Sequence, residues 1–114
     1  MSNIQVRASF KIYDGKYEEF IKLAALCLAS VKEKDSDTLQ YDWFFSENQK
    51  ECVIREKYTD STAVLTHVGN LGGLLGELLE VSDMQLEVFG NASKELVTAT
   101  AGLKPKFYSF FQGI

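Results

Sequence analysis

The sequence predicts an α+β domain with a ferredoxin-like βαββαβ order, in which two long helices cover one face of an antiparallel sheet. An alternating segment lies near the amino terminus, two more alternating segments flank a short polar loop, and helical repeats follow the first and third segments. The 114 residues are enough for one domain with a hydrophobic core, and we assign residues 1–114 to it.

The first strand and the first helix follow from their periods. Apolar residues at every second position from Ile4 to Ile12 predict a strand with one buried face. Asp14 and Gly15 are suited to a cap and a turn, and a helical repeat then extends to Lys34. The apolar members of this repeat are Phe20, Leu23, Ala24, Cys27, Leu28 and Val31.

A hairpin is predicted next. Residues 47–50 form its polar loop between two alternating strands. The inward set of the first strand is Leu39, Tyr41, Trp43 and Phe45, and that of the second is Cys52, Ile54, Glu56 and Tyr58.

Asp60 or Ser61 can cap a second helix, whose apolar stripe includes His67 and continues to Leu79. Glycines interrupt this helix, and each costs about 1 kcal/mol of helix propensity relative to Ala. We expect close packing of the helix on the sheet to explain them, with room for a ligand or a flexible pocket entrance as the alternative. They are Gly69, Gly72, Gly73 and Gly76, and their spacing matches no phosphate-binding loop.

The carboxy-terminal part is predicted to add smaller elements. Met84, Leu86 and Val88 alternate as a fourth strand, and Ser93 is suited to cap a short helix that runs to Thr100. Residues 107–111 follow the single proline and form a candidate aromatic strand.

Composition restricts the partners. The net charge is −4 and the Lys and Arg residues are scattered, so we expect no nucleic acid partner. A basic and apolar leader and a membrane-length apolar run are both lacking, so we expect a cytoplasmic protein without a membrane partner. Cys27 and Cys52 are expected to be reduced core thiols, and a single His does not provide the usual ligands of structural zinc.

Glu56 and His67 occupy positions where the pattern expects apolar residues. An ionisable group on an apolar face must be neutral, paired or functional. The alternatives are that His67 is a hydrogen-bonded core residue, that Glu56 satisfies a backbone donor or a Tyr hydroxyl, and that Trp43 is plain core.

Tyr41-x-Trp43 on one strand precedes Glu56-x-Tyr58-x-Asp60-Ser61-x-Ala63-x-x-x-His67, and Glu87-Val88-Phe89-Gly90 precedes the short helix. With these motifs in this order, the chain resembles the antibiotic biosynthesis monooxygenase (ABM) domain family. The resemblance implies a dimeric α/β barrel, a homodimer formed through the sheets, with residues 103–114 as an extension that contacts the partner subunit. Arg7, Asp42, Arg55 and Lys57 lie on the opposite sheet face, where they could pair across such a dimer.

The resemblance further implies a cofactor-independent monooxygenase of a small quinol-like or phenolic molecule. His67 would accept a phenolic proton, Glu56 would orient it, and the ligand would lie between Tyr41, Trp43, Phe45 and Tyr58. The resemblance to the cofactor-free oxygenases of this family implies that no cofactor is needed. Haem degradation is not expected, because the Asn that the haem-degrading members use is absent from residues 4–12. The alternatives are an isomerase of a small oxygenated metabolite and a non-catalytic dimer that binds a small ligand.

Overall fold

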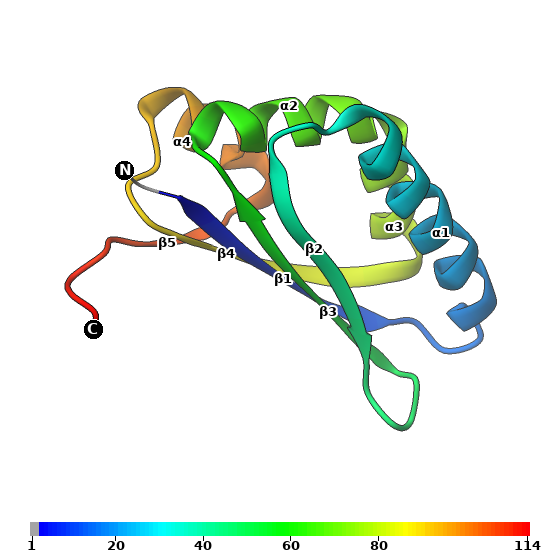
Figure 1. Cartoon of the computed structure of the whole chain (residues 1–114). Coiled ribbons are helices and arrows are strands. Elements are labelled where there is room, and N and C mark those ends of the chain that lie inside the picture. The colour runs from blue at the N-terminus through cyan, green and yellow to red at the C-terminus, as the bar shows by residue number, and fades with distance from the viewer. Residues whose placement is uncertain (1–2) are drawn as a thin grey trace.

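The computed structural model describes residues 3–114 and has two layers, a five-stranded sheet and helices that cover one of its faces (Figure 1). This arrangement confirms the predicted α+β, ferredoxin-like class. In chain order the elements are β1 (Ile4–Ile12), α1 (Tyr17–Lys34), β2 (Thr38–Phe45), β3 (Glu51–Tyr58), α2 (Ser61–Leu71), α3 (Gly73–Val81), β4 (Ser82–Phe89), α4 (Lys94–Ala99), the 3-10 helix η1 (Ala101–Leu103) and β5 (Lys106–Tyr108).

The strands lie in the order β2-β3-β1-β4-β5. The pairs among β1 to β4 are antiparallel, whereas β5 joins the edge of β4 in parallel. Val6 on the central strand lies opposite both Glu56 and Val88. Because residues directly opposite one another share a face of the sheet, Glu56 points into the layer between sheet and helices.

The hydrophobic core consists of two clusters. The first cluster contains buried residues of β1, α1, β3 and the α2–α3 region, such as Phe10, Phe20 and Leu78. The second cluster joins β1, β3 and β4 to α2 and α4, and includes Val64 and Leu96. Leu86 packs against both clusters. The buried core therefore has a seam beneath α2.

The predicted second helix is broken in two. Gly72 has φ 55° and ψ −127°, a backbone conformation accessible essentially to glycine, and it separates α2 from α3. The expected close packing around the glycines is wrong. A Cβ at Gly69, Gly72, Gly73 or Gly76 would meet no other part of residues 3–114 within 4 Å, because these positions face solvent.

Other elements differ in detail from the prediction. Lys16 rather than Asp14 is the first-helix N-cap, and no side chain caps it. Leu28 and Leu39 are exposed; for Leu39, a register shift between Thr38 and Gln40 interrupts the alternation. The aromatic strand ends at Tyr108, and the residues after it run away from the sheet (Figure 1).

The two cysteines have the environment expected of core thiols. Cys27 and Cys52 are buried and unpaired. Burial raises the pKa of the Cys27 thiol to about 11 and that of Cys52 to about 12, which keeps both protonated at neutral pH.

Replacing Asp60 by Ala should lower the free energy of unfolding by about 1 kcal/mol. The Asp60 side chain accepts a hydrogen bond of 2.9 Å from the Ala63 amide at the start of α2, and Ala cannot accept it. Urea denaturation followed by circular dichroism measures the change. Asp60→Asn is the matched control and should keep most of the stability, since Asn is also a good N-cap. Equal stability of Asp60→Ala and wild type would contradict this role.

Candidate active site

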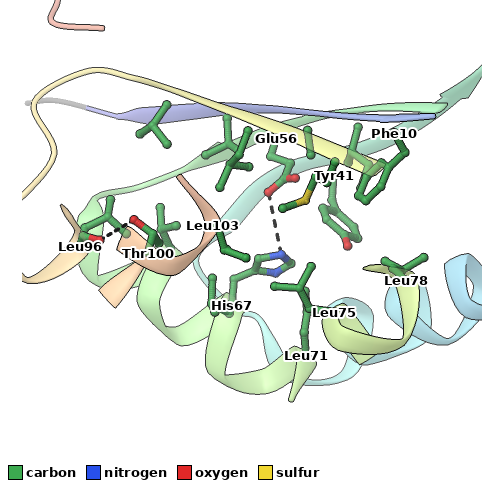
Figure 2. A pocket seen from close by; sticks show the side chains of 18 residues that line it. Phe10, Tyr41, Glu56, His67, Leu71, Leu75, Leu78, Leu96, Thr100 and Leu103 are labelled. Carbon is green, nitrogen blue, oxygen red and sulfur yellow. Dashed lines mark hydrogen bonds and ion pairs between the residues drawn. The ribbon is translucent and has the colours of Figure 1, made fainter. Parts of the chain in front are cut away.

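A cavity of about 50 Å³ lies between the sheet and the helices, at the seam between the two core clusters. In Figure 2, Glu56 and His67 face each other across the cavity, with Phe10 and Leu78 to one side and Leu96 and Leu103 to the other. Most of the lining is aliphatic. The lining residues are Val6, Ala8, Phe10, Tyr41, Ile54, Glu56, Val64, His67, Val68, Leu71, Leu75, Leu78, Met84, Leu86, Val88, Leu96, Thr100 and Leu103.

His67 is held by an aspartate that follows α1. The imidazole Nδ1 lies 2.7 Å from Asp35 Oδ2, and both side chains are at least 95% buried. Asn70 donates to Asp35 Oδ1 at 2.6 Å, and the Thr38 hydroxyl donates to Oδ2 at 3.2 Å. Because a carboxylate only accepts, the Nδ1 atom of His67 carries the proton. The unprotonated Nε2 of the neutral ring then faces Glu56 in the cavity.

Glu56 lies on β3 opposite the imidazole, with its Oε1 3.8 Å from His67 Nε2. The Tyr58 hydroxyl, two residues along the same strand face, donates a hydrogen bond to Oε1. Burial raises the pKa of Glu56 from 4.5 to about 7, while the bond from Tyr58 opposes the shift. Burial also raises the pKa of Tyr58, and the neighbouring Glu56 carboxylate adds to that effect.

The pKa of His67 moves the other way. Burial lowers it from 6.5, and the hydrogen bond and charge of Asp35 limit the fall. A neutral imidazole and a carboxyl group that binds a proton near neutral pH therefore lie side by side. This pair provides a base and an acid inside an apolar cavity, where bulk water does not compete with them as a proton donor or acceptor.

The four aromatic residues predicted to bind the ligand fall into two groups, those that reach the site and those that do not. Tyr41 lines the cavity, and its ring centroid is 5.0 Å from that of His67. Tyr58 is fully buried beside the pair and reaches the site through its hydroxyl. Trp43 and Phe45 do not line the cavity. They pack around Phe20 in the first cluster, where edge-to-face contacts hold their rings.

Sequence reasoning missed Asp35 and Asn70. Asp35 lies in a polar stretch after the last turn of α1, where nothing in the local pattern distinguishes it from its solvated neighbours Ser36 and Asp37. Asn70 is three residues after His67, a spacing that places two side chains on the same side of a helix. That spacing is the signal that could have identified Asn70.

Within the part of the chain that the structure describes, no three His, Cys, Asp or Glu side chains group as ligands for a metal ion. No helix among residues 3–114 combines the length and the apolar character needed to cross a membrane.

Several solved structures share this fold. MupZ from Pseudomonas fluorescens has a TM-score of 0.83 and 22% sequence identity, over 98% of this chain and 93% of that chain. A "putative antibiotic biosynthesis monooxygenase" from Caulobacter crescentus has a TM-score of 0.70 and 22% identity, over 76% of this chain and 87% of that chain. SnoaB, a cofactor-independent oxygenase from Streptomyces nogalater, has a TM-score of 0.68 and 15% identity, over 82% of this chain and 97% of that chain. The chain matches no protein-family model and no curated protein. The likenesses confirm the expected ABM-like fold.

Replacing Glu56 by Gln should flatten the pH dependence of stability between about pH 4.5 and 7. In wild type the folded state binds the Glu56 proton more tightly than the unfolded state, so this contribution is full below pH 4.5 and is lost as pH rises to about 7. The difference between wild type and variant should change by roughly 2–3 kcal/mol across the window.

Urea unfolding at a series of pH values measures this difference, with the exposed Glu80→Gln on α3 as the matched control. A wild type and a Glu56→Gln variant with parallel stability curves would show that Glu56 has an ordinary proton affinity in the folded chain.

Proposed function

We propose that this chain is a cofactor-independent monooxygenase of a small quinol-like or phenolic molecule. The observation that carries the proposal is the oriented, neutral His67, whose Nε2 faces an apolar cavity while its Nδ1 is fixed on Asp35. Such a nitrogen can remove the proton of a bound hydroxyl group, and burial of the product anion makes it a better electron donor.

The reaction balances without another reductant. His67 takes the hydroxyl proton of the substrate, and the resulting phenolate passes one electron to dioxygen. The two radicals then join at a ring carbon, and His67 returns its proton to the resulting peroxide anion, which becomes a hydroperoxide. The O–O bond breaks as the ring carbon gives its proton to His67 and becomes a carbonyl carbon, and Glu56 protonates the departing oxygen, which leaves as water. The proton then passes from His67 to the neighbouring Glu56, which restores both groups. One atom of dioxygen therefore enters the quinone product and the other enters water.

Two further facts support an oxidoreductase. SnoaB is a cofactor-independent oxygenase, and the Caulobacter protein is a "putative antibiotic biosynthesis monooxygenase", so both likenesses support a monooxygenase-like role. Tyr41 provides a ring beside His67, and the aliphatic lining would keep water from a reactive anion. Tyr58 would assist by holding Glu56 in place.

A second candidate is isomerisation of a small oxygenated metabolite. An isomerase needs a base that removes a proton from one atom of the substrate and an acid that returns a proton at another atom. The neighbouring His67 and Glu56 satisfy this requirement. The described lining contains no Lys or Arg, so this version applies to a substrate without a phosphate group.

Wild type should consume dioxygen with a panel of hydroquinones and phenols, and His67→Gln should lower the rate at least about 100-fold. Gln can keep a hydrogen bond to Asp35 but cannot take the proton. An oxygen electrode measures the rate, and the exposed Thr66→Ala on the same helix is the control that should remain active.

Full activity in His67→Gln, or no consumption by wild type, would sink the oxygenase assignment. In that case, solvent deuterium incorporated into the substrate without dioxygen would support the isomerase. Binding without turnover in either assay would leave a non-catalytic ligand-binding protein.

We also propose that the active form is a homodimer joined through the exposed face of the sheet. Arg7 and Glu87 form an ion pair of 3.0 Å on that face, and Asp42 lies opposite Arg55. The segment after β5 adds aromatic side chains that the rest of the chain leaves exposed, with Phe110 at 71% and Phe111 at 89%. A partner subunit would cover these side chains.

Removing residues 109–114 should shift the protein from dimer to monomer, because exposed aromatic side chains would no longer be buried against the partner. Sedimentation velocity at micromolar concentration measures the shift. The double change Phe110→Ser and Phe111→Ser in the full chain separates the effect of these rings from that of chain length. A monomeric wild type would refute the dimer, and a dimeric truncated chain would refute the role of the tail.

A further inference from the structure

We propose that the cavity is built for a substrate that carries an uncharged alkyl chain, which extends from the reacting ring toward α4. This inference rests on the proposed function and deepens it by naming the part of the substrate that does not react. It follows from the side chains that line the cavity on the two sides of Glu56 and His67 (Figure 2).

The two sides of the pair differ in their aromatic content. On the side of the first cluster, the rings of Phe10 and Tyr41 lie among aliphatic side chains such as that of Ile54. These flat walls suit an aromatic ring. On the side of the second cluster, the lining is small and aliphatic, formed by Val6, Val64, Val88 and Leu96. A flexible alkyl chain is the group that such a surface binds most favourably.

The second side also lacks a free polar group among the described lining residues. The Thr100 hydroxyl is the polar side-chain group there, and it already donates to the Leu96 carbonyl oxygen at 2.8 Å. A carboxylate or phosphate placed beside Leu96 would lose its hydration and find no cation. The cavity therefore selects against a charged chain.

The cavity is smaller than this substrate. About 50 Å³ has room for only a few water molecules. Val68, Leu75 and Leu103 are the half-buried lining residues of the helical layer and mark the point where the cavity approaches solvent. They lie on α2, α3 and η1, and the break at Gly72 separates the first two of these elements. The alkyl chain of the substrate would enter here and displace the Leu103 side chain from the cavity.

Isothermal titration calorimetry of the full-length protein tests this inference with phenol, 4-ethylphenol, 4-butylphenol and 4-hexylphenol, and with the anion 4-hydroxybenzoate. Affinity should rise about fourfold for each methylene group until the space beside Leu96 is filled. The anion should bind at least about tenfold more weakly than 4-ethylphenol.

Two variants test where the alkyl chain of the ligand binds. Val88→Phe fills the aliphatic side and should abolish the gain with chain length while phenol still binds. Leu103→Phe, at a half-buried position of the lining, should narrow the entrance and weaken binding of the long phenols most. Val97→Phe on the exposed side of α4 is the matched control and should bind like wild type.

Affinity that does not depend on chain length, or 4-hydroxybenzoate that binds as tightly as 4-ethylphenol, would overturn the inference. The calorimetric result is independent of turnover. Chain-dependent binding without oxygen uptake would contradict the oxygenase alone, and rapid turnover of phenol without any gain from alkyl groups would contradict the alkyl site alone.

Discussion

The contact between Asp35 and His67 is the interaction on which the site depends. It joins the end of α1 to the middle of α2, so it fixes two helices of the helical layer to each other. It also fixes the tautomer of the imidazole. The Asp35 carboxylate has donors from three side chains, which offset the cost of removing its charge from water. Loss of one partner from such a buried network costs roughly 3–5 kcal/mol, so stability and chemistry are coupled here.

The seam between the two core clusters explains why a cavity exists in so small a domain. Ile54 and Tyr58 flank Glu56 on β3 and belong to different clusters, and Val64 and Leu71 do the same around His67 on α2. The polar side chains of Glu56 and His67 at the boundary prevent the two clusters from packing directly against each other, because each of these side chains needs hydrogen-bond partners of its own. The cavity is thus a product of the same residues that would perform the chemistry.

Local patterns predicted most of the fold. The period of two in residues 4–12 defined β1 and its inward face, and the cap signals at Asp60 and Ser93 correctly marked the starts of α2 and α4. The inward direction of Glu56 and His67 followed from the same periods. Asp35 could not be found in this way, since its role arises from a contact across 32 residues of sequence. Trp43 shares its strand face with Tyr41, so alternation alone could not tell a core ring from a cavity wall.

The two margins of the sheet are protected by different means. At β4 the short parallel strand β5 occupies the hydrogen-bonding groups of Glu87 to Phe89. At β2 the shift in register between Thr38 and Gln40 interrupts the regular ladder at one end of the strand. Each feature shortens the regular strand to which further chains could add, which disfavours open-ended growth. In the homodimer that we propose, self-association would use the broad face of the sheet and would close after two copies.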